Sequence, residues 1–339
     1  MIPCPRLNHN VSISDDGKYQ ICGHMNTEQS FNSYAELKQS QWIVDLTSKF
    51  DNDVWPDECI RCQEIEKTQQ PSVRKHSIKN HEIYYQENND YIFVSGVLDN
   101  ICNSACIMCS SHVSTYIGKL TKNVIVINNV DKFYEIPSEQ ILVFEMAGGE
   151  PSVSKSYKQV LTSLSNSTKF IRINTNGGKF IPEIIPLLDK GIDITITFSV
   201  DGTNNIFEYI RWPVKWQQFS EILEKYIELS NKYEKLHLNS WATISALNIG
   251  ELANIIEWAS QINVPLSYAI LHDPFELDIK YTNDLTITAK QKLINSNNVE
   301  LMNLAALVAI DRDNTVLLNK FIEKQDSIRN ININNYFKE

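Results

Sequence analysis

The chain has 339 residues, of which 42% are hydrophobic and 21% are charged, so it can form one large globular domain with an appended module. Its net charge of −10 argues against a broad surface for nucleic acid or anionic membranes, although a local basic pocket is compatible with it. The sequence contains no apolar run of about 18 residues and no apolar signal-peptide core, so we predict a cytoplasmic protein without membrane contact.

Four of the seven cysteines lie near the N-terminus: Cys4, Cys22, Cys59 and Cys62. An Asp-Gly pair between residues 10–14 and 19–22 predicts a hairpin, which would bring the first two of these cysteines together. A helix is expected from Ser33 to about Phe50, before the C-x2-C pair. Four thiolates bind either zinc or an iron–sulfur cluster, and the type of ligand alone does not decide between them.

From residue 91 onward, apolar runs alternate with segments of helical pattern. Strands are expected at 91–97, 141–147, 169–174, 192–199, 237–244 and 264–271. Helices are expected at about 112–120, 153–165, 180–190, 216–230 and 249–260. This alternation predicts an α/β fold with a parallel sheet. Residues 274–339 are expected to be mainly helical.

Three further cysteines, Cys102, Cys106 and Cys109, follow the first of these strands as a C-x3-C-x2-C run. Three thiolates at such short spacings can hold three corners of a 4Fe–4S cluster and leave the fourth iron open. Zinc ribbons favour C-x2-C pairs instead. An open iron can bind a further molecule, so the pattern indicates a catalyst more than an electron carrier.

The C-x3-C-x2-C run resembles the cluster-binding loop of the radical S-adenosylmethionine (radical SAM) enzymes. The resemblance implies that SAM chelates the open iron and is cleaved reductively to a 5′-deoxyadenosyl radical, which abstracts hydrogen from a substrate. It also implies that the six strand–helix units form a partial (β/α)6 TIM-like barrel. In such barrels the chemistry lies at the C-terminal ends of the strands.

The residues that follow the strands fit this resemblance. Gly148-Gly149-Glu150 is similar to the GGE motif that receives the amino group of SAM, and Ser199-Val-Asp-Gly with Arg211 resembles a further SAM-binding stretch. An Arg is apt for a carboxylate because its planar fork can bond both oxygens. The full set of expected SAM contacts is Met108, Gly148, Gly149, Glu150, Asn174, Asn176, Ser199 and Arg211.

The N-terminal pattern C-x12-G-x4-C, followed by C-x2-C, looks like the twitch or SPASM modules of radical SAM enzymes. Glu64, Glu66, Ser72 and Arg74 also look like the subset in which this module precedes the core. The resemblance implies an auxiliary 4Fe–4S cluster, with zinc as the alternative. We therefore expect an auxiliary-cluster module over 1–85, a radical SAM core over 86–275 and a helical extension over 276–339.

The substrate is expected to be a small molecule such as a sugar, cyclitol or nucleotide derivative, because the cysteine module occupies the place of an N-terminal leader-recognition domain. A peptide-modifying maturase is the alternative, and a non-enzymatic zinc-binding interaction module on a degenerate barrel is a rival from another class. An electron donor such as ferredoxin or flavodoxin is implied. No acid or base is assigned, although Glu145, His237 and His272 are candidates for lining the barrel interior.

Overall fold

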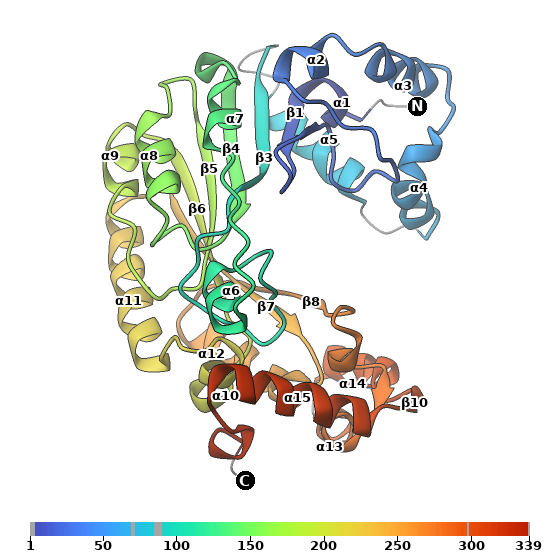
Figure 1. Cartoon of the computed structure of the whole chain (residues 1–339), viewed down its shortest axis with the longest axis vertical. Coiled ribbons are helices and arrows are strands. Elements are labelled where there is room, and N and C mark those ends of the chain that lie inside the picture. The colour runs from blue at the N-terminus through green and yellow to red at the C-terminus, as the bar shows by residue number, and fades with distance from the viewer. Residues whose placement is uncertain (1–3, 69–71, 85–89, 297, 338–339) are drawn as a thin grey trace.

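A single eight-stranded sheet organises the molecule, with strand order β2-β1-β3-β4-β5-β6-β7-β8. The computed structural model describes residues 4–68, 72–84, 90–296 and 298–337. All six predicted strands are present and pair in parallel: β3 (Ile92–Asp99), β4 (Ile141–Gly148), β5 (Phe170–Thr175), β6 (Asp193–Ser199), β7 (Leu236–Ile244) and β8 (Leu266–Ile270). The predicted α/β fold is thereby confirmed, and the arrangement is consistent with a partial barrel (Figure 1).

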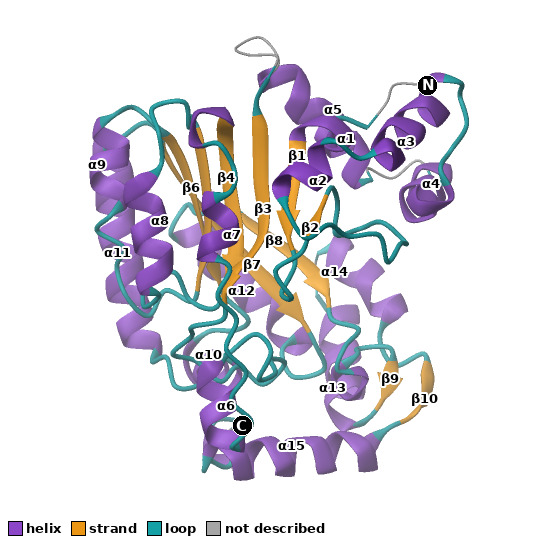
Figure 2. Ribbon diagram, turned by 45° about the horizontal axis from the view of Figure 1, so that its top comes forward, coloured by secondary structure: helices purple, strands orange, loops and turns teal. Residues whose placement is uncertain are grey.

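The helices between these strands cover one face of the sheet, as Figure 2 shows for α8, α9 and α11. The predicted helices are α6 (Thr115–Thr121), α8 (Lys155–Ser163), α9 (Ile184–Asp189), α11 (Trp216–Lys232) and α12 (Leu252–Gln261). Two short helices were not predicted, α7 (Val130–Tyr134) and α10 (Asn204–Ile210). The core lies between helices and sheet, where the fully buried rings of Phe144, Phe198 and Phe219 belong to one cluster.

The N-terminal module begins with α1 (Arg6–His9) and the predicted hairpin of β1 (Asn10–Ile13) and β2 (Tyr19–Gln20). The helix expected from Ser33 to Phe50 is wrong in one respect: it is split into α2 (Tyr34–Lys38) and α3 (Gln41–Asp51). Ser40 adopts an extended backbone between them and stands at the N-cap position of the second helix, a position that Ser favours. The module continues with η1 (Asp57–Cys59), α4 (Ile60–Lys67) and α5 (Val73–Tyr84).

The hairpin is part of the main sheet, because β1 pairs in parallel with β3 over Asn10↔Phe93 to Ile13↔Gly96. Asn129 reinforces the junction: its amide donates to the carbonyl oxygens of Ser14 and Val97, at 2.9 and 2.8 Å. The strand that leads into the cysteine triplet is therefore held on its other edge by the N-terminal module.

The C-terminal extension is mainly helical, as predicted, with α13 (Asp284–Ile294), α14 (Val299–Leu304) and α15 (Thr315–Arg329). Two very short strands, β9 (Tyr281–Thr282) and β10 (Asp311–Asp313), pair in parallel beside them. Arg329 donates to the carbonyl oxygen of Tyr209 at 2.7 Å, so α15 packs against α10. None of the described helices is long and apolar enough to cross a membrane.

Candidate functional site

A cavity of about 240 Å³ opens at the C-terminal ends of β4, β5 and β6. All three cysteines of the triplet line it, together with seven of the eight residues expected to contact SAM. The exception is Met108, which packs against the hydrophobic cluster that contains Ile107 and Tyr209. We call this space the cluster cavity.

The segment that carries the triplet, residues 100–114, is fixed mainly through its backbone; we call it the cysteine loop. Ala105 N–H donates to the carbonyl oxygen of Trp212 at 2.7 Å, and Ile107 N–H donates to that of Ile210 at 2.9 Å. The Ser114 hydroxyl donates to the carbonyl oxygen of Ser104 at 2.7 Å. These contacts hold the sulfur-bearing residues in place without using their side chains.

Gly148 and Gly149 allow the end of β4 to approach the start of the cysteine loop. Two backbone amides bond across this approach: Gly149 N–H donates to the carbonyl oxygen of Asp99 at 2.9 Å, and Glu150 N–H donates to that of Ile101 at 2.7 Å. A Cβ atom at either glycine would lie 2.1 Å from one of these two oxygens. Only glycine fits such a close backbone approach.

Glu150 is buried and its carboxylate accepts three hydrogen bonds. Two reach Oε1, from Thr175 Oγ1 at 2.7 Å and Ser152 N–H at 3.0 Å, and the third reaches Oε2 from Asn176 N–H at 2.7 Å. Burial raises the pKa of this carboxyl group, while the donors at Asn176, Ser152 and Thr175 act in the opposite direction. Glu150 therefore ties the end of β4 to the end of β5.

The two candidate asparagines after β5 differ in their surroundings. The amide of Asn176 donates to Asn103 Oδ1 at 2.9 Å and to Ser104 Oγ at 2.8 Å, and its oxygen accepts from Gly178 N–H at 2.8 Å. Asn176 thus braces the cysteine loop. Asn174 is exposed and faces the cluster cavity, so it is the more accessible of the two.

Arg211 follows α10 and is held between a carboxylate and a cysteine. Its Nε lies 2.5 Å from Asp201 Oδ2, as an ion pair without aligned hydrogen-bond geometry, and its Nη1 lies 3.9 Å from Cys106 Sγ. Asp201 is fully buried and also accepts from Thr243 N–H at 2.7 Å. Burial opposes the charge on Arg211, but Asp201 outweighs this effect and the pKa of the guanidinium is raised.

The three thiols of the triplet titrate differently. Burial raises the pKa of Cys102 to about 12. The pKa of Cys106 is lowered to about 7, first because the thiol of Cys109 donates to it and further because Arg211 is near. A cationic neighbour of this kind favours the thiolate, which is the form that binds iron.

The sequence did not indicate several residues that organise this site. Asn103, Ser104 and Trp212 act through contacts between segments far apart in the chain, and no local pattern signals them. Asp201 was indicated only as part of the Ser199-Val-Asp-Gly stretch, with no role of its own. His237 and His272 do not line the cluster cavity: the first lies 3.3 Å from Asp193 and the second 2.9 Å from Asp278.

The four N-terminal cysteines come together around a second, smaller cavity, which we call the four-cysteine site. Cys4 precedes α1, Cys22 follows β2, Cys59 ends η1 and Cys62 lies in the first turn of α4. Burial, together with a smaller contribution from the nearby thiols, raises the pKa of both Cys4 and Cys59 to about 12. Four segments therefore place four cysteines around one cavity of the N-terminal module.

A buried ion pair supports the four-cysteine site from one side. The Glu66 carboxylate accepts from Arg74 Nη2 at 2.6 Å, Arg74 Nε at 2.9 Å and Ser72 Oγ at 2.5 Å. The Arg74 guanidinium also stacks over Trp55, 4.9 Å from the ring centre. Glu66 lies one helical turn after Cys62, so the pair fixes the helix that carries the C-x2-C sequence.

Both sites have donor sets that suit iron–sulfur clusters, with three and four thiols around their cavities. Within the described residues, no three His, Cys, Asp or Glu side chains are placed to hold a single metal ion. A cluster binds each thiolate to a different iron, so its cysteines need not converge on one point.

Residues 97–259 match the family model described as the Radical SAM superfamily. This segment is similar to the radical SAM domain. The matched region contains the cysteine triplet and the seven lining residues described above. No curated protein matched the sequence.

Solved structures similar to the chain include anSMEcpe with bound AdoMet, at 16% identity and a TM-score of 0.40. The match covers 59% of this chain and 58% of that chain, so the chain spans less than two thirds of this neighbour. Streptococcus suis SuiB bound to S-adenosylmethionine matches at 13% identity and a TM-score of 0.38, over 80% of this chain and 64% of that chain. SuiB bound to precursor peptide SuiA matches at 13% identity and a TM-score of 0.37, over 94% and 70%.

Proposed function

We propose that the chain is a radical SAM enzyme whose catalytic centre is the cluster cavity. One observation carries this proposal: the cysteine triplet shares a single cavity with Gly149, Glu150, Asn174 and Arg211, which come from three further segments. Cys102, Cys106 and Cys109 would hold a 4Fe–4S cluster with one open iron. When bound and reduced, this cluster and SAM supply a 5′-deoxyadenosyl radical that abstracts hydrogen from the substrate.

The residues of the chain would bind and orient SAM beside the open iron. Asn174 and Ser199 present polar groups to the cavity, and Gly148–Glu150 offers backbone carbonyl oxygens for an amino group. The guanidinium of Arg211, held by Asp201, provides a fixed positive charge next to Cys106. Asn176 acts as a positioning residue, because its donors are engaged by the cysteine loop. Met108 would pack near the adenine from its hydrophobic cluster.

The four-cysteine site would hold an auxiliary 4Fe–4S cluster, as in a twitch module, with zinc as the alternative. Four thiols around one cavity support either metal centre. We assign residues 1–85 to this module, 86–275 to the core and 276–339 to the extension. The pairing of β1 with β3 means that module and core share one sheet.

The proposed substrate is a small molecule, and a peptide is the alternative. An auxiliary cluster could accept an electron from the substrate radical, which would make the net reaction an oxidation. A small electron carrier such as ferredoxin or flavodoxin would reduce the catalytic cluster, and we place the enzyme in the cytoplasm.

Reductive SAM cleavage by anaerobically reconstituted protein tests the proposal. Iron, sulfide and zinc are measured first, and 5′-deoxyadenosine is then quantified by mass spectrometry after addition of dithionite and SAM. We expect production by the wild type and by Arg312→Gln, an exposed substitution in the extension, and none by Cys106→Ala. Bound zinc without iron, together with no 5′-deoxyadenosine, would instead support the zinc-binding interaction module.

A further inference from the structure

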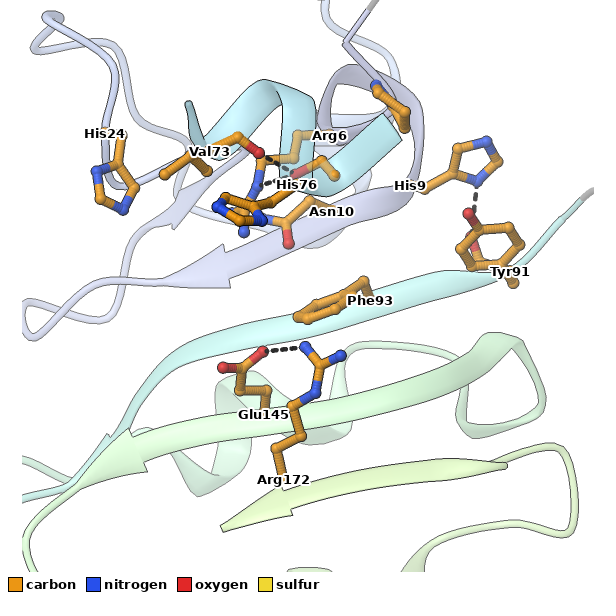
Figure 3. Close-up of a pocket in the computed structure, with 12 residues that line it drawn as sticks. Arg6, His9, Asn10, His24, Val73, His76, Tyr91, Phe93, Glu145 and Arg172 are labelled. Carbon is orange, nitrogen blue, oxygen red and sulfur yellow. Dashed lines mark hydrogen bonds and ion pairs between the residues drawn. The ribbon is translucent and has the colours of Figure 1, made fainter. Parts of the chain in front are cut away.

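A third cavity, of about 300 Å³, lies between the N-terminal module and the inner face of the sheet. Figure 3 shows its construction: Arg6, Asn10 and His76 approach from the module, and Phe93, Glu145 and Arg172 approach from β3, β4 and β5. This volume is at the lower end of the range typical for small-molecule sites. We call it the N-terminal cavity.

Positive charge dominates the N-terminal cavity although the whole chain carries a net charge of −10. Two guanidinium groups, from Arg6 and Arg172, face a single carboxylate, that of Glu145. Glu145 is paired with Arg172 at 3.2 Å, so its charge is matched locally. Three histidines, His9, His24 and His76, add imidazoles to the lining.

Arg6 is oriented toward the cavity by contacts with neutral groups. Its Nε donates to Ser77 Oγ at 2.9 Å, and its guanidinium lies 6.0 Å from the centre of the Phe93 ring. Among the described residues, no carboxylate forms an ion pair with it. A fixed guanidinium of this kind suits a carboxylate or phosphate group.

Asn10 gives an independent indication of a ligand. Its side chain is 3% exposed, and its amide nitrogen donates to the carbonyl oxygen of Ile21 at 2.7 Å. The remaining oxygen, Oδ1, has no hydrogen-bond partner within the described residues, and Asn10 lines the cavity. A buried acceptor without a partner is costly, so a hydroxyl or amine donor from a bound molecule would satisfy it.

The N-terminal cavity is placed between the two cysteine sites. On β4, Glu145 lines the N-terminal cavity, and Ala147, two residues later, lines the cluster cavity. On β5, Arg172 lines the N-terminal cavity, and Asn174, two residues later, lines the cluster cavity. Residues two apart share a face of a strand and lie about 7 Å apart. Arg6 and His24 also border the four-cysteine site.

We propose that the N-terminal cavity binds the substrate through an anionic group, a carboxylate or a phosphate, held by Arg6, while Asn10 Oδ1 accepts from a hydroxyl or amine of the same molecule. The rest of the substrate extends along β4 and β5 toward the cluster cavity. This inference rests on the proposed function and narrows the substrate class to anionic molecules that carry a hydrogen-bond donor.

Titration calorimetry on the reconstituted full chain tests this site with three probes of one shape. Phenyl phosphate and benzoate carry the two candidate anions, and benzyl alcohol is the uncharged control. We expect at least one anion to bind at one site per chain and benzyl alcohol to bind at least about ten-fold more weakly, since the bonds to the charged group are lost. The preferred anion identifies phosphate or carboxylate as the recognised group.

Two variants with opposite expected effects make the test specific. Arg6→Gln should weaken anion binding about ten-fold or more, and Glu145→Gln should tighten it several-fold because a like charge is removed. Arg312→Gln, the same substitution at an exposed site outside the cavity, should leave binding unchanged. Binding of neither anion, or equal binding by the Arg6 and Arg312 variants, would overturn the inference.

The two proposals fail in different ways. Production of 5′-deoxyadenosine by the same wild-type preparation, without anion binding, counts against the substrate site alone. Anion binding that depends on Arg6, without 5′-deoxyadenosine production, supports the site and counts against the radical SAM function.

Discussion

The amide of Asn176 lies 2.8 Å from the hydroxyl of Ser104, and this contact joins the end of β5 to the loop that carries the cysteine triplet. Asn174, two residues earlier, faces the same cavity but is exposed. We therefore propose separable roles for the two asparagines, Asn176 in positioning the loop and Asn174 in contacting a ligand.

Replacing each asparagine by alanine should separate these roles. Asn176→Ala removes two donors to the cysteine loop, so we expect a loss of about 1–3 kcal/mol in stability and faster release of iron to a chelator. Asn174→Ala should weaken SAM binding and leave the rate of iron release unchanged. Iron release followed by absorbance, with SAM affinity from calorimetry, measures both. Equal iron release by the two variants would contradict the assigned difference.

Gly149→Ala should disrupt the cysteine loop directly. The added Cβ would lie 2.1 Å from the carbonyl oxygen of Ile101, next to Cys102, so either the loop or the end of β4 has to move. We expect destabilisation of about 1–3 kcal/mol or more and loss of 5′-deoxyadenosine production. Gly250→Ala is the control, because its Cβ would meet Ala289 at an ordinary 3.4 Å. Full iron content and activity in Gly149→Ala would show that the close approach is dispensable.

The Arg211–Asp201 pair should show strong coupling in unfolding experiments. Arg211→Leu leaves the fully buried Asp201 carboxylate without its cation, and we expect a loss of about 3–5 kcal/mol. The double variant Arg211→Leu/Asp201→Asn should lose less, because no buried charge remains unpaired. Urea unfolding of the wild type, the single variants Arg211→Leu and Asp201→Asn, and the double variant gives the coupling energy.

A second ion pair, which lies at the surface, provides the comparison for the Arg211 and Asp201 variants. Lys215 and Glu208 lie 2.7 Å apart, but the lysine side chain is 58% exposed, so Lys215→Leu should cost less than about 1 kcal/mol. Additive effects of the Arg211 and Asp201 substitutions would refute the coupling.

The Glu66–Arg74 pair should make the stability of the N-terminal module depend on pH. Burial alone would raise the pKa of Glu66, but the hydrogen bonds from Arg74 and Ser72 outweigh it and lower the pKa below its usual value of 4.5. A lowered pKa in the folded state means that the carboxylate stabilises the fold above pH about 4.5 and that this contribution is lost as the pH falls. The difference in stability between wild type and Glu66→Gln should therefore stay nearly constant from pH 7 to about 5 and shrink as the pH falls below about 4.5.

Glu64→Gln is the matched control for this experiment, since Glu64 is on the same helix but 58% exposed in its pair with Lys67. Its effect on stability should be small at every pH, as is usual for surface pairs. Thermal unfolding across this pH range measures both variants. A pH-independent difference for Glu66→Gln would show that the charge of Glu66 is not what stabilises the module.

The sequence predicted the strands of the barrel because each is rich in apolar and β-branched residues, either in a run, as at 141–147, or alternating with polar residues, as at 192–199, and helical patterns lie between them. The break at Ser40 was not predicted, since the residues around it favour helix on both sides. For Glu150 and Asn176, the sequence predicted the location at the strand ends but not the hydrogen-bond partners. A motif indicates which strand ends meet, but it does not show which groups donate hydrogen bonds to a carboxylate. Those contacts, such as Thr175 to Glu150, depend on the register between strands.

Because β1 pairs with β3, a strand that is synthesised much later, the N-terminal module emerges from the ribosome well before its partner strand in the sheet. About 80 residues lie between these strands, so β3 follows β1 from the ribosome after roughly 4–16 s. During that interval the hairpin has only β2 and its own module beside it. A metal bound at the four-cysteine site would stabilise the nascent module before its place in the sheet exists. Metal binding at the four-cysteine site would thus precede the pairing of β1 with β3, the strand that leads into the cysteine triplet.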